Sequence, residues 1–290
     1  MATVKAETKL IDQAGCRTAK VRVRQRRGPN AWSECIQDDC LADETAIALV
    51  YNGIAHAVMM ASPTDLEDFA LGFSLSEGIL TRAGELYDLE ITDHGDRGIE
   101  LKLQIHGGCM DALKRQHRTL AGPSGCGLCG QTSLAQALRP LPEIARRSPP
   151  AAEAVQRALQ QLGDHQPLQR CTGAIHAAAW CTPEGQVQML REDVGRHNAL
   201  DKLIGALHRR QVHRDNGFVL VSSRASYELV AKMARCNLGS LVAVSGATAV
   251  AVDRANHSGL NLIGFARDGR QVVYHSTDHE PFQRYPDSIP

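Results

Sequence analysis

The sequence predicts an α/β fold, with a smaller region of strands and one helix ahead of a larger domain. From about residue 150 onward, short apolar runs alternate with helical patterns, which is typical of a largely parallel or mixed sheet covered by helices on both faces. Before that point, β-rich runs flank an Asn-Gly turn, and an alternating strand follows. With 290 residues and 43% hydrophobic side chains, the chain can bury a sizeable core without cross-links.

Charge and cysteine content limit the possible functions. The 32 basic and 32 acidic side chains cancel to a formal net charge of zero, so no overall field would hold nucleic acid or an anionic membrane. The sequence has no apolar run of about 18 residues and no signal core near its start. Its nine scattered cysteines do not form a paired framework. We expect a cytoplasmic protein that binds neither nucleic acid nor membrane, with most thiols reduced and any anion site local.

The first forty residues are predicted to be a flexible basic arm. They contain "KVRVRQRRGPN" (20–30), a basic run without a helical apolar period that ends in a Gly-Pro stop. Order is expected to begin in "TAIALVYNGIAHAVMMA" (45–61), where two β-rich runs surround Asn52 and Gly53, the strongest short signal for a hairpin.

A helix and a strand are predicted next. Ser62 is a plausible N-cap, Pro63 suits the first helical position, and Gly78 marks the end of the helix. In "IELKLQI" (99–105), apolar and polar residues alternate, which predicts a half-buried strand.

The stretch "SGCGLCG" (124–130) places Cys126 and Cys129 in a C-x-x-C motif among glycines. A neighbouring thiol and backbone N–H groups stabilise the reactive thiolate in such a motif, and the glycines allow a bulky partner to approach. Three interpretations remain open: a zinc site completed by His106 and Cys109, a dithiol oxidoreductase, and a thiolate that carries a transferable group.

After this loop a short helix (132–138), a Pro-rich break and a helix stopped at Gly163 precede the alternating part. Helices are predicted for 197–210, 226–238 and 247–258, and strands for 173–181, 186–192, 217–223, 241–246, 260–266 and 271–276.

Polar residues concentrate at three places where strands end. "REDVGRHNALDK" (191–202) contains Arg196 and His197 at a helix N-terminus, where N–H groups favour anions, and "VSSRASYE" (221–228) repeats the pattern. "GFARDGR" (264–270) adds two arginines around a tight turn. These junctions are typical of a phosphate-holding crevice, although ordinary helix capping and an edge hairpin would explain the same residues.

His176 is expected to be a core histidine, because a lone histidine in an apolar strand is more often structural than catalytic. Zinc nucleobase deaminases use H-x-E followed by a C-x-x-C. Here Ala178 occupies the glutamate position and the C-x-x-C precedes the histidine, so the sequence argues against deamination.

The chain resembles the FdhD family of sulfur carrier proteins, which active formate dehydrogenase requires. The resemblance runs from about Glu44 to Tyr274. Its most specific parts are the glycine-flanked cysteine pair and "EDVGRHNALDK" (192–202), supported by "SPTDLEDFALGFSLSEGI", "TGAIHAAAW", "SSRASYELVAKM" and "GLNLIGFARDGRQVVY".

The resemblance implies a small N-terminal α+β domain and a C-terminal cytidine-deaminase-like α/β/α sandwich that lacks the deaminase zinc site. With the predicted arm, this gives three segments: 1–40, 41–130 ending in the C-x-x-C loop, and 131–290. It also implies a homodimer.

The resemblance further implies a sulfurtransferase that accepts persulfide sulfur from a cysteine desulfurase and passes it to Mo-bis-molybdopterin guanine dinucleotide, which then enters apo formate dehydrogenase. Cys126 would bear the persulfide, and Cys129 would assist transfer or resolution; no resident metal is expected. The nucleotide ends of the molybdenum cofactor would contact Phe265, Ala266, Arg267, Asp268, Gly269, Arg270, Arg196, His197, Ser223 and Arg224.

Two alternatives to this function remain. One is a non-catalytic chaperone for cofactor insertion with structural zinc at the C-x-x-C, and the other is a nucleotide-binding redox regulator. Metal analysis of the purified protein separates the chaperone from a sulfur carrier. The chaperone would contain about one equivalent of zinc, and a chelator would remove the zinc and unfold the protein.

Overall fold

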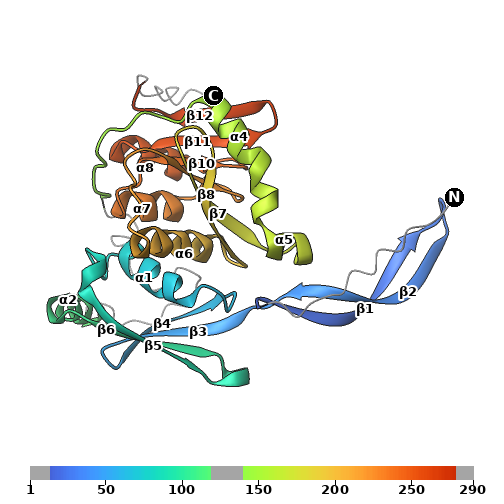
Figure 1. Ribbon diagram of the computed structural model, residues 1–290, viewed down its shortest axis with the longest axis horizontal. Helices are drawn as coiled ribbons and strands as arrows, with labels where there is room; N and C mark the ends of the chain where they lie inside the picture. The colour runs from blue at the N-terminus through green and yellow to red at the C-terminus, as the bar shows by residue number, and fades with distance from the viewer. Residues whose placement is uncertain (1–13, 119–139, 279–290) are drawn as a thin grey trace, which may run out of the picture.

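The computed structural model describes residues 14–118 and 140–278, and these form three sheets with flanking helices (Figure 1). A two-stranded hairpin projects away from the body. A four-stranded sheet lies beside its base, and a six-stranded sheet forms the centre of the larger domain. The predicted short helix at 132–138 lies outside the described residues. Within them, no helix is both long enough and apolar enough to cross a membrane.

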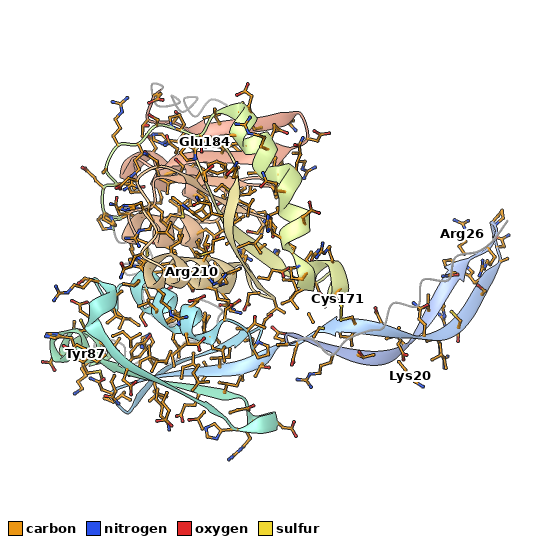
Figure 2. The ribbon with its side chains drawn as sticks, in the orientation of Figure 1. Lys20, Arg26, Tyr87, Cys171, Glu184 and Arg210 are labelled. Atoms are coloured by element: carbon orange, nitrogen blue, oxygen red, sulfur yellow. A yellow bond between two sulfur atoms is a disulfide. The ribbon has the colours of Figure 1, made fainter. Side chains whose placement is uncertain are left out.

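From Cys16 onward, the projecting hairpin corrects the prediction of a flexible arm over residues 1–40, of which residues 1–13 lie outside the described part. Strands β1 (Cys16–Arg26) and β2 (Trp32–Ala42) pair in an antiparallel ladder. Acidic residues of β2 lie across from the basic residues of β1, so Glu34 forms ion pairs with Arg22 and Arg24. The ladder therefore offsets the charge repulsion that the basic run alone implied. Lys20 and Arg26 lie out along this hairpin (Figure 2).

Three of the four strands of the smaller sheet were predicted, and β5 was not. The strand order of this sheet is β4-β3-β6-β5, and the Asn52-Gly53 turn joins the first hairpin as predicted, with both residues at positive φ. The strands are β3 (Thr45–Tyr51), β4 (Ile54–Ala61), β5 (Leu86–Asp93) and β6 (Ile99–Ile105). Helix α1 (Leu66–Ser76) covers one face, and α2 (Gly107–Arg118) follows β6.

Helix α1 begins later than the sequence predicts. Its first residue is Leu66, and Asp65 at φ 51° precedes it, so Ser62 is not its N-cap. Ser62 instead donates its backbone N–H to Asp193 Oδ2 (3.0 Å) and accepts at Oγ from the backbone N–H of Val194 (3.1 Å). These contacts hold the segment before the helix against the larger domain.

The larger sheet has the order β12-β11-β10-β9-β7-β8. Its three central strands, β9, β10 and β11, are parallel, and the remaining neighbours are antiparallel, which confirms the predicted mixed sheet. The strands are β7 (His176–Cys181), β8 (Val187–Asp193), β9 (Phe218–Val221), β10 (Ser240–Ala243), β11 (Asn261–Arg267) and β12 (Arg270–His275).

Helices cover both faces of this sheet, as the alternation predicted. Helices α6 (Arg196–Arg209), α7 (Tyr227–Arg235) and α8 (Ala249–Ser258) lie on one face, and α4 (Ala152–Leu162) lies on the other (Figure 1). The short helix α5 (Pro167–Thr172) lies near the base of the hairpin. The layers are α/β/α, and the likeness to cytidine deaminases stays a prediction.

A helix crossing joins the two sheets. Helix α1 packs on α6 so closely that a Cβ atom added at Gly72 would lie 1.7 Å from the carbonyl oxygen of Asp201. Likewise, a Cβ at Gly205 would lie 1.9 Å from the carbonyl oxygen of Asp68. Buried residues on both sides of the crossing form one apolar cluster. The orientation of the smaller sheet on the larger domain therefore depends on two glycines.

One pair of thiols departs from the expectation that most are reduced. Cys40 in β2 and Cys171 in α5 form a disulfide, with Cα atoms 6.0 Å apart. Cys35, Cys109, Cys181 and Cys236 keep their thiols, in agreement with that expectation. The sequence could not reveal the pair, because its members are separated by 131 positions.

Candidate functional site

The three polar junctions that the sequence singled out lie at one edge of the larger sheet. The parallel strands β9, β10 and β11 all end there, and the pairing of His176 with Asp193 places the start of β7 and the end of β8 at the same edge. Arg196 and His197 open α6, Ser223 and Arg224 follow β9, and the 265–270 turn closes β11. This edge is where open α/β sheets bind ligands.

Backbone hydrogen bonds fix the loops of this edge to one another. The N–H of Phe265 donates to the carbonyl of Ser245 (2.9 Å), the N–H of Ser245 donates to Ser223 (3.3 Å), and the N–H of Ala225 donates to Gly246 (3.1 Å). The loops after β9 and β10 and the last part of β11 therefore form one connected surface. The sequence prediction missed the middle loop, 244–248, although it also connects a strand to a helix.

Phe265 is the centre of the third junction. It has φ 48°, a left-handed conformation that is uncommon for an aromatic residue and often marks a functional position. Its half-buried ring packs on Gly246, where an added Cβ would lie 2.8 Å from the ring. The guanidinium carbons of Arg267 and Arg270 lie 6.0 and 5.5 Å from the ring centroid. This combination of an aromatic ring and two cations suits a nucleotide.

Helix α4 holds the turn that carries these two arginines. The backbone N–H of Gly269 donates to Gln156 Oε1, and Gln156 Nε2 donates to the carbonyl of Arg267 (both 3.0 Å). Ala266 is buried and contributes to the core, whereas Arg267, Asp268, Gly269 and Arg270 are exposed. The exposed side chains are available to a ligand.

Buried polar atoms without a partner gather where α6 and α7 begin. Among the described residues, Arg196 Nε, His197 Nε2 and Tyr227 Oη are buried and have no hydrogen-bond partner. The nearest carboxylate oxygen of Glu228 is 3.8 Å from His197 Nε2, beyond hydrogen-bond distance. Native proteins rarely leave such atoms unpaired, so they mark a place for water or a ligand. Tyr227 was missed by the sequence prediction although it lies within the second junction.

Asp193 holds the turn between β8 and α6. Its buried Oδ1 accepts from the N–H of Gly195 (2.8 Å) and from Asn198 Nδ2 (3.0 Å), while Oδ2 forms an ion pair with Lys202 (2.6 Å). The N-cap of α6 is Gly195, which receives no side-chain cap bond, so Asp193 and Asn198 are not the helix caps that one interpretation of the sequence proposed. Their contacts do not explain Arg196 and His197 either, whose buried nitrogens stay unpaired in the described part of the chain.

A cavity of about 410 Å³ opens at this edge beside His176. His176 was predicted to be a core histidine, but it is only half-buried, and burial together with the charge of Arg196 lowers its pKa. The cavity is lined by Gln166, Gln169, Gly173, Ala174, Ile175, His176 and Ser222. A second cavity, of about 720 Å³, lies where β9 begins, at the opposite edge of the sheet from the three junctions.

We expect His197 to remain neutral down to about pH 4, because burial, Arg196 and Lys232 lower its pKa to about 4. An unfolded histidine binds a proton below about pH 6.5, so the unfolded state takes up more protons than the folded state between these values. The contribution of His197 to the free energy of unfolding is therefore complete above pH 6.5 and decreases as the pH falls towards 4. Nitrogen NMR of the imidazole checks this, and a midpoint near 6.5 would contradict it.

Neither cysteine of the C-x-x-C can be placed, because Cys126 and Cys129 lie outside the described residues. The other half of the zinc alternative, His106 and Cys109, is described. Burial and a hydrogen bond to Glu85 raise the pKa of Cys109, which keeps it protonated, and the N–H of Gly108 donates to His106 Nδ1 (3.1 Å). Zinc binding would have to release this proton and displace the hydrogen bond to Glu85.

One other group of potential metal ligands occurs within the described ranges. The sulfur atoms of Cys16, Cys40 and Cys171 lie within 4.8 Å of one another at the base of the hairpin.

The chain matches a known protein family. Residues 42–280 match the model of the FdhD/NarQ family. A "Sulfur carrier protein FdhD" from Cupriavidus necator is 52% identical over 251 residues, which cover 87% of this chain and 85% of that protein. The protein of the same description from Variovorax paradoxus is 48% identical over 248 residues, covering 86% and 89%.

A solved structure has the same fold. It is described as that of a "formate dehydrogenase accessory protein" from Desulfotalea psychrophila, and it matches with a TM-score of 0.67 over 91% of this chain and 98% of that chain. Its sequence identity is 21%, so the likeness concerns the fold alone.

Proposed function

Because the chain belongs to the FdhD/NarQ family, whose relatives are named sulfur carrier proteins, we propose that it accepts sulfur from a cysteine desulfurase and delivers it to molybdenum for formate dehydrogenase. In this proposal the sulfur travels as a persulfide on Cys126. The substrate is Mo-bis-molybdopterin guanine dinucleotide, which is afterwards inserted into apo formate dehydrogenase. The chain acts as a cytoplasmic homodimer and as a sulfurtransferase.

One structural observation carries this proposal: three junctions that contain arginine meet at one edge of the sheet, together with serines of the second junction and unpaired buried polar atoms of the first two. A cofactor with several phosphate groups needs several separate anion sites. A chain with zero formal net charge can provide them only as local arginine and N–H clusters. Arg196, Arg224, Arg267 and Arg270 supply the positive charge there, and Phe265 offers a ring beside a base.

The sulfur step is a thiolate displacement. The Cys126 thiolate attacks the outer sulfur of the persulfide on the desulfurase, a new sulfur–sulfur bond forms on Cys126, and the cysteine of the desulfurase leaves as a thiolate. The rate depends on the thiolate fraction and on access, and the glycines on both sides of Cys126 favour access. Cys129, three positions on, is placed by sequence to assist transfer or to resolve the persulfide.

Intact-protein mass spectrometry after incubation with a cysteine desulfurase and labelled cysteine tests the sulfur step. We expect one added sulfur atom on the peptide that contains Cys126. The Cys126→Ala variant should keep its circular dichroism spectrum and lose the added sulfur. Normal loading of this variant would contradict the assignment of Cys126.

Binding of guanosine diphosphate, the nucleotide end of the proposed substrate, tests whether the three junctions form the nucleotide site. We expect Arg196→Ala to weaken this binding by at least about tenfold, because a charge-assisted hydrogen bond contributes about 1.5–3 kcal/mol. Titration calorimetry measures this. Arg210→Ala is the matched control, because Arg210 is exposed at the other end of α6 and should leave the affinity unchanged. Equal affinities for the two variants would exclude Arg196 from the nucleotide site.

A further inference from the structure

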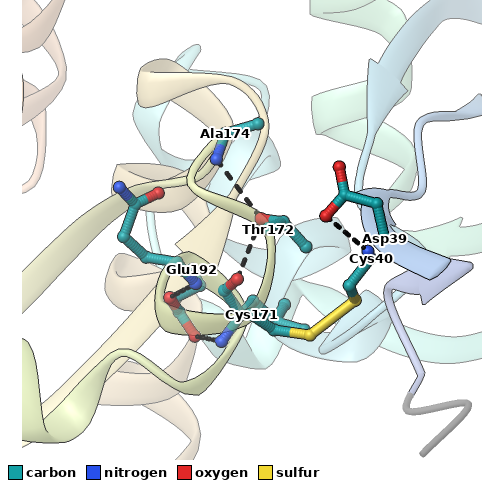
Figure 3. The surroundings of a disulfide bond; sticks show 8 residues. Asp39, Cys40, Cys171, Thr172, Ala174 and Glu192 are labelled. Carbon is teal, nitrogen blue, oxygen red and sulfur yellow. Dashed lines mark hydrogen bonds between the residues drawn. A yellow bond between two sulfur atoms is a disulfide. The ribbon is translucent and has the colours of Figure 1, made fainter. Parts of the chain in front are cut away.

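Three cysteines from distant parts of the chain meet at the base of the projecting hairpin. Cys16 begins β1, Cys40 lies near the end of β2, and Cys171 belongs to α5. Their sulfur atoms all lie within 4.8 Å of one another. Cys40 and Cys171 form a disulfide (Figure 3). Cys16 carries a thiol.

We propose that these residues form a thiol–disulfide exchange site, in which Cys16 displaces Cys171 from its disulfide with Cys40. The Cys16 thiolate attacks Cys40 Sγ, the bond between Cys16 and Cys40 forms, and the bond between Cys40 and Cys171 breaks. Cys171 leaves as a thiolate and takes up the proton that Cys16 released. The exchange is internal and changes no oxidation state, so it needs neither oxidant nor reductant.

The strand register supports attack by Cys16. Cys16 pairs with Ala42 and Thr18 pairs with Cys40, so the two cysteines are two positions apart along the ladder and their side chains share one face of the hairpin. Cys171 is the most exposed of the three, whereas Cys16 and Cys40 are only 7% and 3% exposed. Exchange therefore moves the disulfide into the hairpin and leaves the free thiol where solvent can reach it.

Noncovalent contacts keep the three sulfurs together when the disulfide moves. The N–H of Asp43 donates to the carbonyl of Gly15 (2.8 Å), which closes the hairpin base. An added Cβ at Gly15 would lie 3.1 Å from the Leu168 side chain of α5, so the base also packs directly on this helix. The start of α5 is held separately, because the carboxylate of Glu192 accepts from the N–H groups of Leu168 and Gln169 (both 2.9 Å).

The exchange has a consequence for the candidate binding edge. Helix α5 and the residues after it supply Gln169, Gly173 and Ala174 to the 410 Å³ cavity beside His176. With Cys40 bonded to Cys171, the hairpin is covalently attached to this wall of the cavity. After exchange the attachment is lost. The proposal stands independently of the sulfur-carrier function, because it uses none of its residues.

Trapping with an alkylating reagent tests the proposal. The folded protein is incubated without reductant in N-ethylmaleimide, then digested, and the labelled cysteines are located by mass spectrometry. We expect label on Cys171, together with a linked peptide that joins Cys16 to Cys40. In the Cys16→Ala variant we expect the label on Cys171 to fall at least tenfold, because no third thiol can displace it.

Two control variants separate this site from other thiols. Cys35→Ala removes an exposed thiol of β2, the strand that also contains Cys40. The Cys126→Ala, Cys129→Ala double variant removes the proposed sulfur-carrying pair. Both should label Cys171 as the unaltered protein does. Loss of the label in either control would overturn the proposal by showing that another thiol opens the disulfide.

Three further results would also overturn it. These are label on Cys16 with none on Cys171, full label on all three cysteines without a linked peptide, and about one equivalent of zinc that is absent from the Cys16→Ala variant. The last result would identify a three-thiolate metal site in place of an exchange site.

Discussion

Replacing Gly205 by alanine is expected to lower the free energy of unfolding by about 3 kcal/mol, the upper part of the usual range for overpacking a core. The added Cβ would lie 1.9 Å from the carbonyl oxygen, 2.7 Å from the carbonyl carbon and 2.9 Å from the Cα of Asp68. All three are backbone atoms of α1, so no side-chain rotation relieves the contact. The helices must separate, which also weakens the bonds that the Asp68 carboxylate accepts from Arg191 and Arg209.

Urea unfolding followed by circular dichroism measures this effect. Gly163→Ala is the matched control, because Gly163 has φ −63° and an added Cβ would have no neighbour within 4 Å. A harmless exchange of glycine for alanine in such a helical conformation gains about 0.5–1 kcal/mol. The two substitutions should therefore shift stability in opposite directions. A change below about 0.5 kcal/mol at Gly205 would show that the crossing is looser than the structure indicates.

Replacing Lys202 by methionine is expected to cost about 3–5 kcal/mol, because it leaves the buried carboxylate of Asp193 without its counter-ion. Both side chains have 0% exposure, and the ammonium nitrogen lies 2.6 Å from Asp193 Oδ2. It also donates to the carbonyl of Ser62 (2.9 Å), which ties α6 to the segment before α1. Burial lowers the pKa of Lys202, and the facing carboxylate opposes this.

The same unfolding measurement checks this prediction. Lys102→Met serves as the control, since Lys102 pairs with Glu90 in solvent and should lose less than about 1 kcal/mol. Adding Asp193→Asn to Lys202→Met should restore part of the stability, because no buried charge is then left unpaired. The single variant should also weaken guanosine diphosphate binding, since Asp193 shapes the turn that carries Arg196. Stability within about 1 kcal/mol of the unaltered protein would contradict the role given to this pair.

Short-range patterns predicted most of the elements. The Asn52-Gly53 hairpin, the alternating strand at 99–105 and the helix that begins near Arg196 all occur as expected. In each case the residues that decide the structure are neighbours in sequence. The prediction of a flexible arm was wrong because the basic run of β1 was considered without the acidic residues of β2 that pair with it.

The candidate site was only partly predictable. Arg196, Ser223 and Phe265 lie at one edge because strand ends in such sheets converge, and the sequence pattern is sufficient for that inference. The loop at 244–248, Tyr227 and the cavity beside His176 required coordinates. Their contribution depends on which loops touch and which atoms are buried, and neither follows from spacing along the chain.

By itself, the sequence determined the order of strands and helices from β7 onward, the mixed sheet and the edge where polar residues collect, because these follow from periodicity and from chain direction. Only the tertiary structure decided where α1 begins, which cysteines pair and how closely α1 crosses α6. Ser62 and Asp193 are 131 positions apart, as are Cys40 and Cys171. Contacts over such separations exist only after the domains have packed, so no local pattern in the chain records them.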